Sequence, residues 1–294
     1  MGIPALQSFE APNRSGRNFA VYTIVALWAT KSSLGYDDSI SAQGCDATVR
    51  QSPRRRHPSV APSRELVADL VMANRIIFIK NIVDGYGHIS ARHNGDPNLY
   101  LMSRLCAPGL VTAKDIDTYD LDSNSLRQLG RPYSERFIHG EIYKVRKDVN
   151  SIIHCHTPHL IPFGVSETPL LPIYQMTSFL GGGVPVFEIR EHAGMSDLLV
   201  RDPKLGKALA ASLSDRPLVL MRGHGATVVG SSIREAVYRS IYAAENAWLQ
   251  MEAMRLGKVT YLAPEEAQLG LHINNTSTDR PWAIWSHEVH TRTK

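Results

Sequence analysis

Two histidines separated by one residue are the clearest chemical signal in the sequence. His154 and His156 flank Cys155 in VNSIIHCH, residues 149–156, whose β-branched composition predicts a short strand. Because side chains alternate across a strand, both imidazoles are expected on one face and the Cys155 thiol on the other. Two imidazoles side by side can chelate a metal ion, although hydrogen-bonded surface or core histidines show the same spacing. The pair alone leaves a metal site and a structural role both open.

Two further residues could complete such a site. His224 lies between two glycines directly after the apolar segment PLVLM, residues 217–221. The glycines allow a sharp turn from which the ring could project into a cleft, although a structural role is also compatible. Glu135 is the second residue of a predicted helix, where a carboxylate also interacts favourably with the helix dipole.

The elements that must position these side chains are a mixture of strands and helices. Ser63 is predicted to cap a helix whose apolar stripe begins at Leu66, and a strand–turn–strand unit is predicted over residues 84–104. A second helix begins at Ser134, and ATVVG, residues 226–230, resumes the strand interrupted by the glycine–histidine–glycine turn. This order lacks a strict strand–helix–strand alternation and predicts a mixed sheet covered by helices.

The last predicted element is a long helix from Ser232 to Gly257. Ser232 and Glu235 are expected to form a capping box at its start. Its apolar stripe is expected to consist of Ile233, Val237, Ile241, Ala244, Trp248 and Met251. Beyond this helix the periodic pattern soon ends, so we assign residues 63–265 to one domain and residues 266–294 to a C-terminal tail.

Residues 1–62 differ in composition from the rest of the chain. They contain seven Lys/Arg and four Asp/Glu and end in RQSPRRRHPSVAPS, which is typical of a solvated linker, with a nuclear signal or a phosphate patch as the alternatives. We expect a poorly ordered N-terminal extension. Its apolar segment, residues 19–30, is too short to cross a membrane but has the length of a signal-peptide core. A buried strand or a disordered leader is favoured, because no clear cleavage site follows.

The overall composition favours a small-molecule enzyme. The 294 residues carry a net charge of +4, of which +3 falls in residues 1–62, so the rest of the chain is close to neutral. Three cysteines without a CxxC pair are typical of a reducing compartment. We therefore expect a cytoplasmic protein that contacts neither nucleic acid nor membrane.

Four motifs in a fixed order resemble the class II aldolase/adducin family. They are GHISAR, an ExxxH motif that begins at Glu135, RKDVNSIIHCH and LVLMRGHGATVVG, and the resemblance covers residues 64–262. It implies a three-layer α/β/α fold around a mixed, mostly antiparallel sheet. It also implies one divalent zinc, manganese or iron ion per chain, held by His154, His156 and His224. Glu135 would be the fourth ligand or the catalytic acid or base, and the chain would form a homotetramer with sites at subunit interfaces.

The departures from the family pattern indicate a substrate without phosphate. Sugar-phosphate aldolases of the family bind phosphate through an Asn, a loop of small hydroxyl residues and a Ser pair. These are replaced here by His88, by MSRLCAPG with Ser103 and Arg104, and by Tyr133-Ser134. A planar guanidinium prefers a carboxylate, which it can bind through two parallel hydrogen bonds.

A second departure concerns the acid tyrosine of those aldolases. It aligns with Gln175, and Tyr174 is one residue away. This shift disfavours cleavage of a phosphorylated sugar. The resulting substrate-binding candidates are Arg104, Ser103, His88, Tyr174 and Gln175.

The branch that this pattern resembles most is the decarboxylases of hydroxylated aromatic or heteroaromatic dicarboxylates. The resemblance implies a metal-dependent lyase that removes CO₂ from a small carboxylate substrate without oxidation, with Arg104 holding the carboxylate that stays. The metal would act as a Lewis acid, and Glu135 or a nearby histidine would supply the proton. Three alternatives stay open. The first is an aldolase of a sugar or 2-keto acid, and the second is a non-haem iron oxygenase, because three histidines can hold Fe(II). The third is an adducin-like interaction protein that has kept only the fold.

Overall fold

A computed structural model of the chain describes residues 61–292. The predictions for residues 1–60, including the apolar segment 19–30, lie outside the described residues. Within the described part, no helix is both long and apolar enough to span a bilayer.

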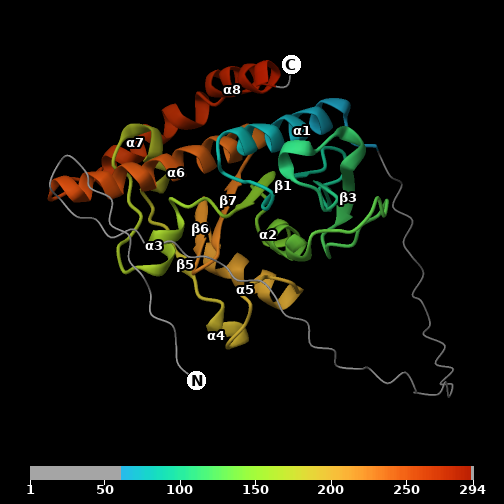
Figure 1. Cartoon of the computed structure of the whole chain (residues 1–294), viewed down its shortest axis with the longest axis horizontal. Helices are drawn as coiled ribbons and strands as arrows, with labels where there is room; N and C mark the ends of the chain where they lie inside the picture. The colour runs from blue at the N-terminus through green and yellow to red at the C-terminus, as the bar shows by residue number, and fades with distance from the viewer. Residues whose placement is uncertain (1–60, 293–294) are drawn as a thin grey trace, which may run out of the picture. The chain divides into compact units, whose positions relative to one another are not determined.

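A seven-stranded sheet forms the centre of the described structure (Figure 1). The strands are β1 (His88–Arg92), β2 (Leu99–Ser103), β3 (Ile116–Asp120), β4 (Ser151–Cys155), β5 (Val186–Phe187), β6 (Leu218–Met221) and β7 (Gly225–Gly230). They lie in the order β3-β2-β1-β4-β7-β6-β5, and every neighbouring pair is antiparallel except β5 and β6. The prediction of a mixed, mostly antiparallel sheet is therefore confirmed.

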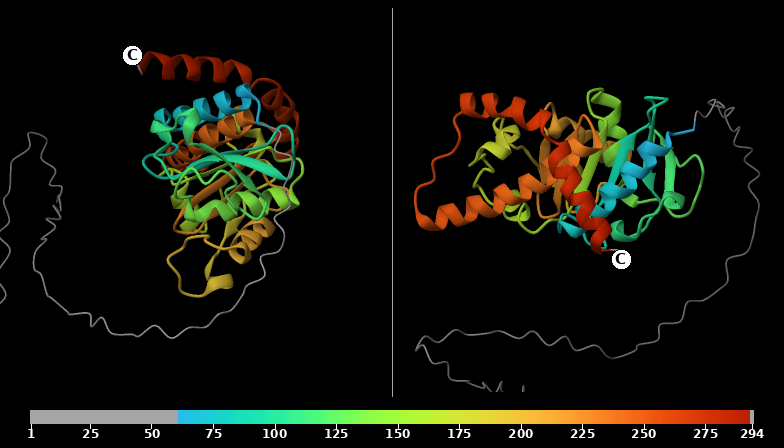
Figure 2. Two further views of the ribbon diagram at one scale, coloured as in Figure 1. Left: turned by 90° about the vertical axis from the view of Figure 1, so that its right-hand side faces the viewer. Right: turned by 90° about the horizontal axis from the view of Figure 1, so that it is seen from above.

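Helices cover both faces of this sheet, as the left view of Figure 2 shows. One face carries α1 (Arg64–Ile79), α6 (Ile233–Leu256) and α8 (Asp279–Arg292), and the other carries α2 (Phe137–Val145) and α5 (Pro203–Leu213). The other helical elements are α3 (Ile161–Val165), α4 (Arg190–Ala193), α7 (Pro264–Thr276), η1 (Pro108–Leu110), η2 (Ala113–Asp115), η3 (Ser134–Arg136) and η4 (Gln175–Leu180). The three-layer α/β/α prediction is confirmed.

Alternation along β4 separates the two hydrophobic cores. Ile153 and Cys155 belong to the core under α1 and α6, whereas Ile152 belongs to the core under α2 and α5. His154 follows the same alternation and faces the α2 side. The predicted opposition of His154 and Cys155 across the strand is thus present.

The starts of α1 and α6 follow the predicted capping chemistry in most respects. The Ser63 hydroxyl accepts a hydrogen bond from the Leu66 N–H, and the Ser232 hydroxyl accepts one from the Glu235 N–H at 3.1 Å. The predicted capping box is wrong in one detail, because the Glu235 carboxylate accepts from the Ser231 N–H instead of that of Ser232.

The predicted apolar stripe of α6 is wrong at Trp248, whose exposed fraction is 46%. The second half of α6 instead buries the amides Asn246 and Gln250. They hold the preceding loop by hydrogen bonds with the backbone of Pro169, Leu171 and Ile173. Because these amides take the buried face, the ring of Trp248 lies on the outer one.

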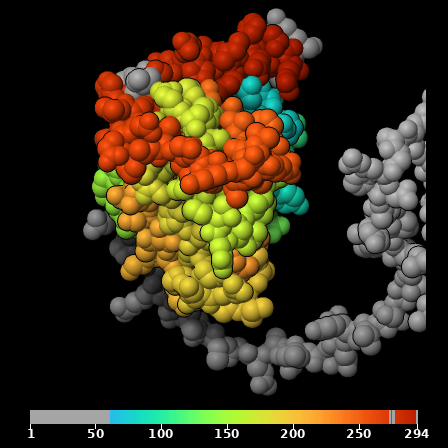
Figure 3. All heavy atoms as spheres, turned by 90° about the vertical axis from the view of Figure 1, so that its left-hand side faces the viewer, coloured from blue at the N-terminus to red at the C-terminus, as the bar shows by residue number. Residues whose placement is uncertain are grey.

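The C-terminal segment forms two packed helices, α7 and α8, where the sequence pattern predicted no element. Figure 3 shows the red atoms of these helices beside the orange atoms of α6. α8 buries Trp282, Trp285 and Val289 in the core under α1 and α6. α7 approaches η4 closely through Gly270, where an added Cβ would lie 2.1 Å from the Ser178 hydroxyl oxygen. Small residues and a few large rings therefore replace a regular apolar stripe.

The turn between β6 and β7 requires glycine at two positions. Gly223 has φ +67°, a conformation that L side chains rarely adopt. At Gly225 an added Cβ would lie 2.1 Å from the carbonyl oxygen of Cys155. The close approach of this turn to β4 brings His224 next to His154 and His156.

Gly225→Ala is expected to destabilise the fold by about 1–3 kcal/mol or more, because the methyl group collides with backbone that cannot move aside easily. Gly85→Ala is the matched control, since nothing lies within 4 Å of a Cβ added there, and it should change stability by no more than about 0.5 kcal/mol. Denaturant unfolding of both variants measures the difference. Equal stability of the two variants would contradict the packing described here.

Candidate metal centre

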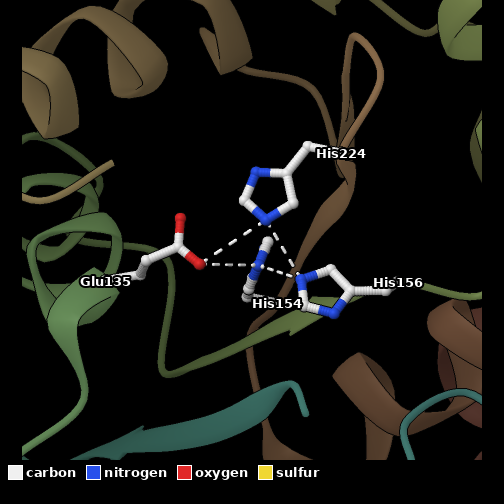
Figure 4. Close-up of side chains that lie close together, drawn as sticks. All are labelled: Glu135, His154, His156 and His224. Carbon is white, nitrogen blue, oxygen red and sulfur yellow. Dashed lines mark hydrogen bonds and ion pairs between the residues drawn. The ribbon is translucent and has the colours of Figure 1, made fainter. Parts of the chain in front are cut away.

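Four potential metal-ligating side chains converge at one end of the sheet (Figure 4). His154 lies on β4, His156 follows β4, His224 lies in the β6–β7 turn, and Glu135 lies in η3 just before α2. Their ligand atoms all lie within 4.8 Å of one another. The fold therefore brings together the four residues that the sequence analysis selected.

The spacing of the ligand atoms matches that of a metal coordination shell. Nε2 of His156 lies 3.0 Å from Nε2 of His154 and 3.1 Å from Nε2 of His224. Oε2 of Glu135 lies 3.4 Å from Nε2 of His154 and 3.5 Å from Nε2 of His224. Four donors at about 2.0–2.1 Å from a zinc ion lie about 3.3–3.4 Å from one another in a tetrahedron. One first-row divalent ion would fit between these atoms.

A break in the helix places Glu135. The prediction of a helix from Ser134 is correct only in part, because η3 comes first and Glu135 has non-helical angles, φ −92° and ψ 17°, before α2 begins at Phe137. The Val200 N–H donates a hydrogen bond of 2.9 Å to Oε1 of Glu135. This bond fixes one carboxylate oxygen and leaves Oε2 facing the histidines.

The protonation states of these groups suit cation binding. Burial, followed by His154 and His224, lowers the pKa of His156 to about 4, and burial with His154 also lowers the pKa of His224. Burial alone would raise the pKa of Glu135, but the histidines and the Val200 N–H outweigh it and bring the value to about 2. At neutral pH, His156 and His224 are therefore neutral and Glu135 is ionised, which are the forms that bind a metal ion.

The chemistry of the donor set also fits a cation. Within residues 61–292, the ion-pair partners of Glu135 are the imidazoles of His154 and His224, with no lysine or arginine among them. The imidazole lone pairs and the ionised carboxylate repel one another at this distance, because little water screens them. A positive charge between these groups would remove the repulsion. Three imidazoles and one carboxylate suit zinc, manganese or iron about equally.

Cys155 is excluded as a further ligand. Burial raises the pKa of its thiol to about 12, and its side chain belongs to the core on the other face of the sheet. A neutral thiol on the opposite face cannot bind the same ion.

His88 and Ser103, two of the predicted substrate-binding residues, lie beside this cluster. His88 pairs with His154 across β1 and β4, and the two ring centroids are 5.1 Å apart. The ring of Tyr133 packs on the ring of His88 at 4.6 Å, and the Tyr133 hydroxyl lies 3.3 Å from the Ser103 hydroxyl. A continuous row of polar side chains thus leads from the cluster to the end of β2.

Arg104 lies at the end of this row and is half exposed. Its Nη2 donates to the Asp115 carboxylate at 2.7 Å. Asp115 also accepts hydrogen bonds from the N–H and hydroxyl of Thr112. These contacts fix the guanidinium through Asp115 and leave part of it exposed to solvent.

Tyr174 and Gln175 lie in a different part of the chain. Gln175 donates to the Asn274 side chain of α7 at 3.3 Å and lines a pocket beside α6 and α8. The Tyr174 hydroxyl is buried, and burial followed by Glu245 of α6 raises its pKa. Within residues 61–292, no hydrogen bond or ion pair joins either of them to the four-residue cluster, so their role in substrate binding stays a prediction.

The sequence analysis gave no role to three buried residues next to the site. His139 lies on α2 one turn after Glu135, and Tyr143 lies one turn further on, whereas Ser90 follows His88 at the strand period of two on β1. All three are fully buried. The signal that could have found them is their spacing. Residues four apart lie on one face of α2, and residues two apart lie on one face of β1, and these two faces meet at the cluster.

Comparison with known proteins agrees with this geometry. Residues 68–251 match the model of the "Class II Aldolase and Adducin N-terminal domain" family. The chain belongs to this family.

Two relatives show the branch of the class II aldolase and adducin family that this chain resembles. The decarboxylase tropJ of Talaromyces stipitatus is 35% identical over 259 residues, which cover 80% of this chain and 96% of the relative. The 3,4-dihydroxyphthalate decarboxylase of Arthrobacter keyseri is 29% identical over 242 residues, covering 78% and 93%. The resemblance to the decarboxylase branch is confirmed, and these relatives support a lyase, with decarboxylation ahead of aldol cleavage.

Solved structures of the family share the fold. An aldolase II superfamily protein from Pseudomonas syringae aligns with a TM-score of 0.64 at 23% identity, covering 78% of this chain and 93% of that one. The L-fuculose 1-phosphate aldolase of Glaciozyma antarctica aligns with a TM-score of 0.63 at 19% identity, covering 76% and 89%. At these identities the likeness concerns the fold alone.

His156→Ala is expected to abolish metal binding while leaving the protein folded, because it removes one of three convergent nitrogens from a partly exposed position. Cys155→Ala is the matched control, since it alters the neighbouring residue on the other face of the sheet and should retain the metal. Metal content per chain by inductively coupled plasma mass spectrometry, with circular dichroism for folding, measures both. Full metal occupancy in the double variant His154→Ala/His156→Ala would contradict the assignment.

Proposed function

We propose that this protein is a divalent-metal-dependent decarboxylase that removes CO₂, without oxidation, from a hydroxylated aromatic or heteroaromatic carboxylic acid. The observation that carries the proposal is a complete three-histidine and carboxylate set flanked by His88, Tyr133 and Ser103. The relatives named as decarboxylases, including those of 3,4-dihydroxyphthalate, support the same substrate class.

The metal would be held by His154, His156 and His224, with Glu135 as a fourth ligand or as the proton carrier. When bound, a divalent ion acts as a Lewis acid that polarises a substrate oxygen and accommodates the negative charge that develops as CO₂ leaves. The remaining chemistry falls to side chains of the chain itself.

Glu135 is suited to carry the proton that replaces CO₂. Its low pKa of about 2 makes it a carboxylate before substrate binds. Oε2 could then accept the proton of a ring hydroxyl that a bound divalent ion would make more acidic. Loss of CO₂ leaves the electron pair of the broken carbon–carbon bond on the ring carbon. Glu135 then returns its proton to that carbon, and the ring oxygen regains a proton from solvent. The Val200 N–H keeps the carboxylate aimed throughout.

The flank of the site would bind the carboxylate that stays on the ring. Arg104 is 42% exposed and is positioned by Asp115, so a guanidinium edge can reach a substrate that enters from solvent. His88 and Ser103 are more deeply buried, and both contact the side chain of Tyr133. A planar acid could therefore contact the metal at one end and the guanidinium at the other.

Assembly and compartment belong to the same proposal. We propose a cytoplasmic homotetramer with sites at subunit interfaces, in which the exposed Gln175 serves the site of a neighbouring subunit. Exposed apolar side chains on α6 and α7, among them Trp248 and Leu269, support an interface there. The three cysteines without a CxxC pair support a reducing compartment. Light scattering coupled to size-exclusion chromatography tests the tetramer.

The function is tested by incubating the metal-loaded protein with 3,4-dihydroxyphthalate and with pyridine dicarboxylates and following CO₂. Parallel assays follow aldehyde release from fuculose and ribulose phosphates, and oxygen uptake. The proposal predicts CO₂ from at least one hydroxylated acid, no oxygen consumption and no aldehyde. Efficient cleavage of a sugar phosphate with no CO₂ from any acid would overturn it in favour of an aldolase.

Two variants should separate proton transfer from substrate binding. Glu135→Gln is expected to lower kcat by ~10²–10⁴-fold, because proton transfer is lost. Arg104→Lys is expected chiefly to raise KM, because a point charge replaces a planar fork. Steady-state kinetics on protein of measured metal content provides both values. A Glu135→Gln enzyme with its metal in place and an unchanged kcat would remove Glu135 from the proton path.

A further inference from the structure

A buried chain of four polar side chains runs from His88 into the layer between the sheet and α2. Nδ1 of His88 lies 2.7 Å from Nε2 of His139, and Nδ1 of His139 lies 2.6 Å from the Ser90 hydroxyl. The Ser90 hydroxyl lies 2.8 Å from the Tyr143 hydroxyl. Ser90, His139 and Tyr143 have 0% exposure and His88 has 3%. Each link has hydrogen-bonding length, so the chain is continuous.

The closed end of the chain fixes the direction of its hydrogen bonds. Within residues 61–292, the hydrogen-bond partner of the Tyr143 hydroxyl is Ser90. A buried hydroxyl proton without an acceptor is costly, so Tyr143 must donate to Ser90. Ser90 then has its own proton left for Nδ1 of His139. The opposite direction would leave the Tyr143 proton unpaired in the core.

This direction sets the tautomers of both histidines. Nδ1 of His139 accepts, so its proton lies on Nε2, which donates to Nδ1 of His88. His88 in turn accepts on Nδ1 and carries its proton on Nε2. In the part of the chain that the structure describes, no carboxylate is hydrogen-bonded to either ring. Burial lowers the pKa of His139 to about 3 and that of His88 well below its ordinary value, in agreement with two neutral rings.

We infer that Tyr143, Ser90 and His139 are positioning residues that hold His88 as a fixed Nε2–H donor, and that this donor recognises an acceptor oxygen of the substrate beside the metal ligands. Within residues 61–292, no hydrogen bond joins Nε2 of His88 to another protein atom. Some unpaired side-chain nitrogens and oxygens of these residues are completely shielded from water, but Nε2 of His88 is not among them. It therefore opens onto accessible space next to His154 and Tyr133. The assignment of the donor rests on hydrogen-bond geometry, and its role toward substrate rests on the proposed function.

The recognised group is an oxygen that accepts a hydrogen bond, and a carboxylate suits a fixed N–H donor best because its charge strengthens the bond. A substrate hydroxyl can also accept through its oxygen, but the bond is weaker, and a group that offers only donors would face the N–H unpaired. The chain of hydrogen bonds thus favours an acidic or carbonyl substituent next to the metal-binding oxygen. This selection is independent of Arg104, which lies at the outer end of the site.

The tautomer is tested by two-bond ¹H–¹⁵N correlation spectra of the full chain, labelled with ¹⁵N-histidine and supplemented with zinc. His88→Gln and His139→Gln assign the two rings. The expected result is a neutral Nε2–H tautomer at both positions. An Nδ1–H tautomer or a doubly protonated ring at His88 near neutral pH would overturn the inference, whether or not the protein has decarboxylase activity.

Ser90→Ala tests whether the chain acts on His88, with Ser151→Ala as the matched control. Both serines are fully buried on neighbouring strands, but the Ser151 hydroxyl donates to the Ser90 carbonyl and stands outside the chain. Ser90→Ala should change the His139 and His88 signals from a single tautomer to a mixture, whereas Ser151→Ala should leave them unchanged. Unchanged signals in a folded Ser90→Ala protein, or equal changes in both variants, would overturn the positioning role.

Kinetics with 3,4-dihydroxyphthalate as the probe test the role toward substrate. His88→Phe removes the donor and should raise KM about tenfold to a hundredfold, the range for a lost hydrogen bond to a charged group. His88→Gln keeps a donor and should recover part of this loss. Ser90→Ala should raise KM with little change in kcat. An unchanged KM in His88→Phe would overturn substrate recognition, whereas absence of CO₂ from the parent enzyme would count against the proposed function and leave the tautomer result standing.

Discussion

The close approach of three imidazole nitrogens and one ionised carboxylate is the interaction on which the rest of the structure depends. Nitrogen atoms of different histidines lie 3.0 and 3.1 Å apart, and those of His154 and His224 lie 3.4 and 3.5 Å from a Glu135 oxygen. Such a cluster is electrostatically satisfied by a divalent cation and by little else that the described chain offers. The sheet, its turn and the start of α2 can be understood as the framework that holds these groups at this separation.

Each element contributes through a specific backbone feature. The antiparallel pairing of β4 with β7 places the β6–β7 turn over the end of β4, and Gly225 lets the two backbones meet. The non-helical residue before α2 turns Glu135 toward the same point. On the other side of β4, β1 presents His88 and Ser90 to the face where α2 presents His139 and Tyr143. The candidate metal centre and the polar chain therefore lie on adjoining elements, since β4 pairs with β1 and Glu135 comes just before α2.

Local sequence patterns predicted the residues whose positions depend on local structure. Strand alternation separated His154 from Cys155, and flanking glycines marked His224, because both features are set within a few residues. The contact between His88 and His139 joins β1 to α2 and is fixed only by tertiary packing, so no local pattern revealed it. Trp248 was misplaced because buried amides, which an apolar stripe ignores, decide the orientation of α6. α7 and α8 were missed because their packing uses glycine contacts and isolated rings instead of a periodic stripe.

Anomalous diffraction from crystals of the purified protein, recorded at the absorption edge of the metal found in it, tests the central claim most directly. The account predicts one peak per chain at about 2.0–2.3 Å from Nε2 of His154, His156 and His224, with a Glu135 oxygen at coordinating or hydrogen-bonding distance. A metal peak elsewhere, or three histidines with intact geometry and no metal after reconstitution with zinc, manganese and iron, would contradict it.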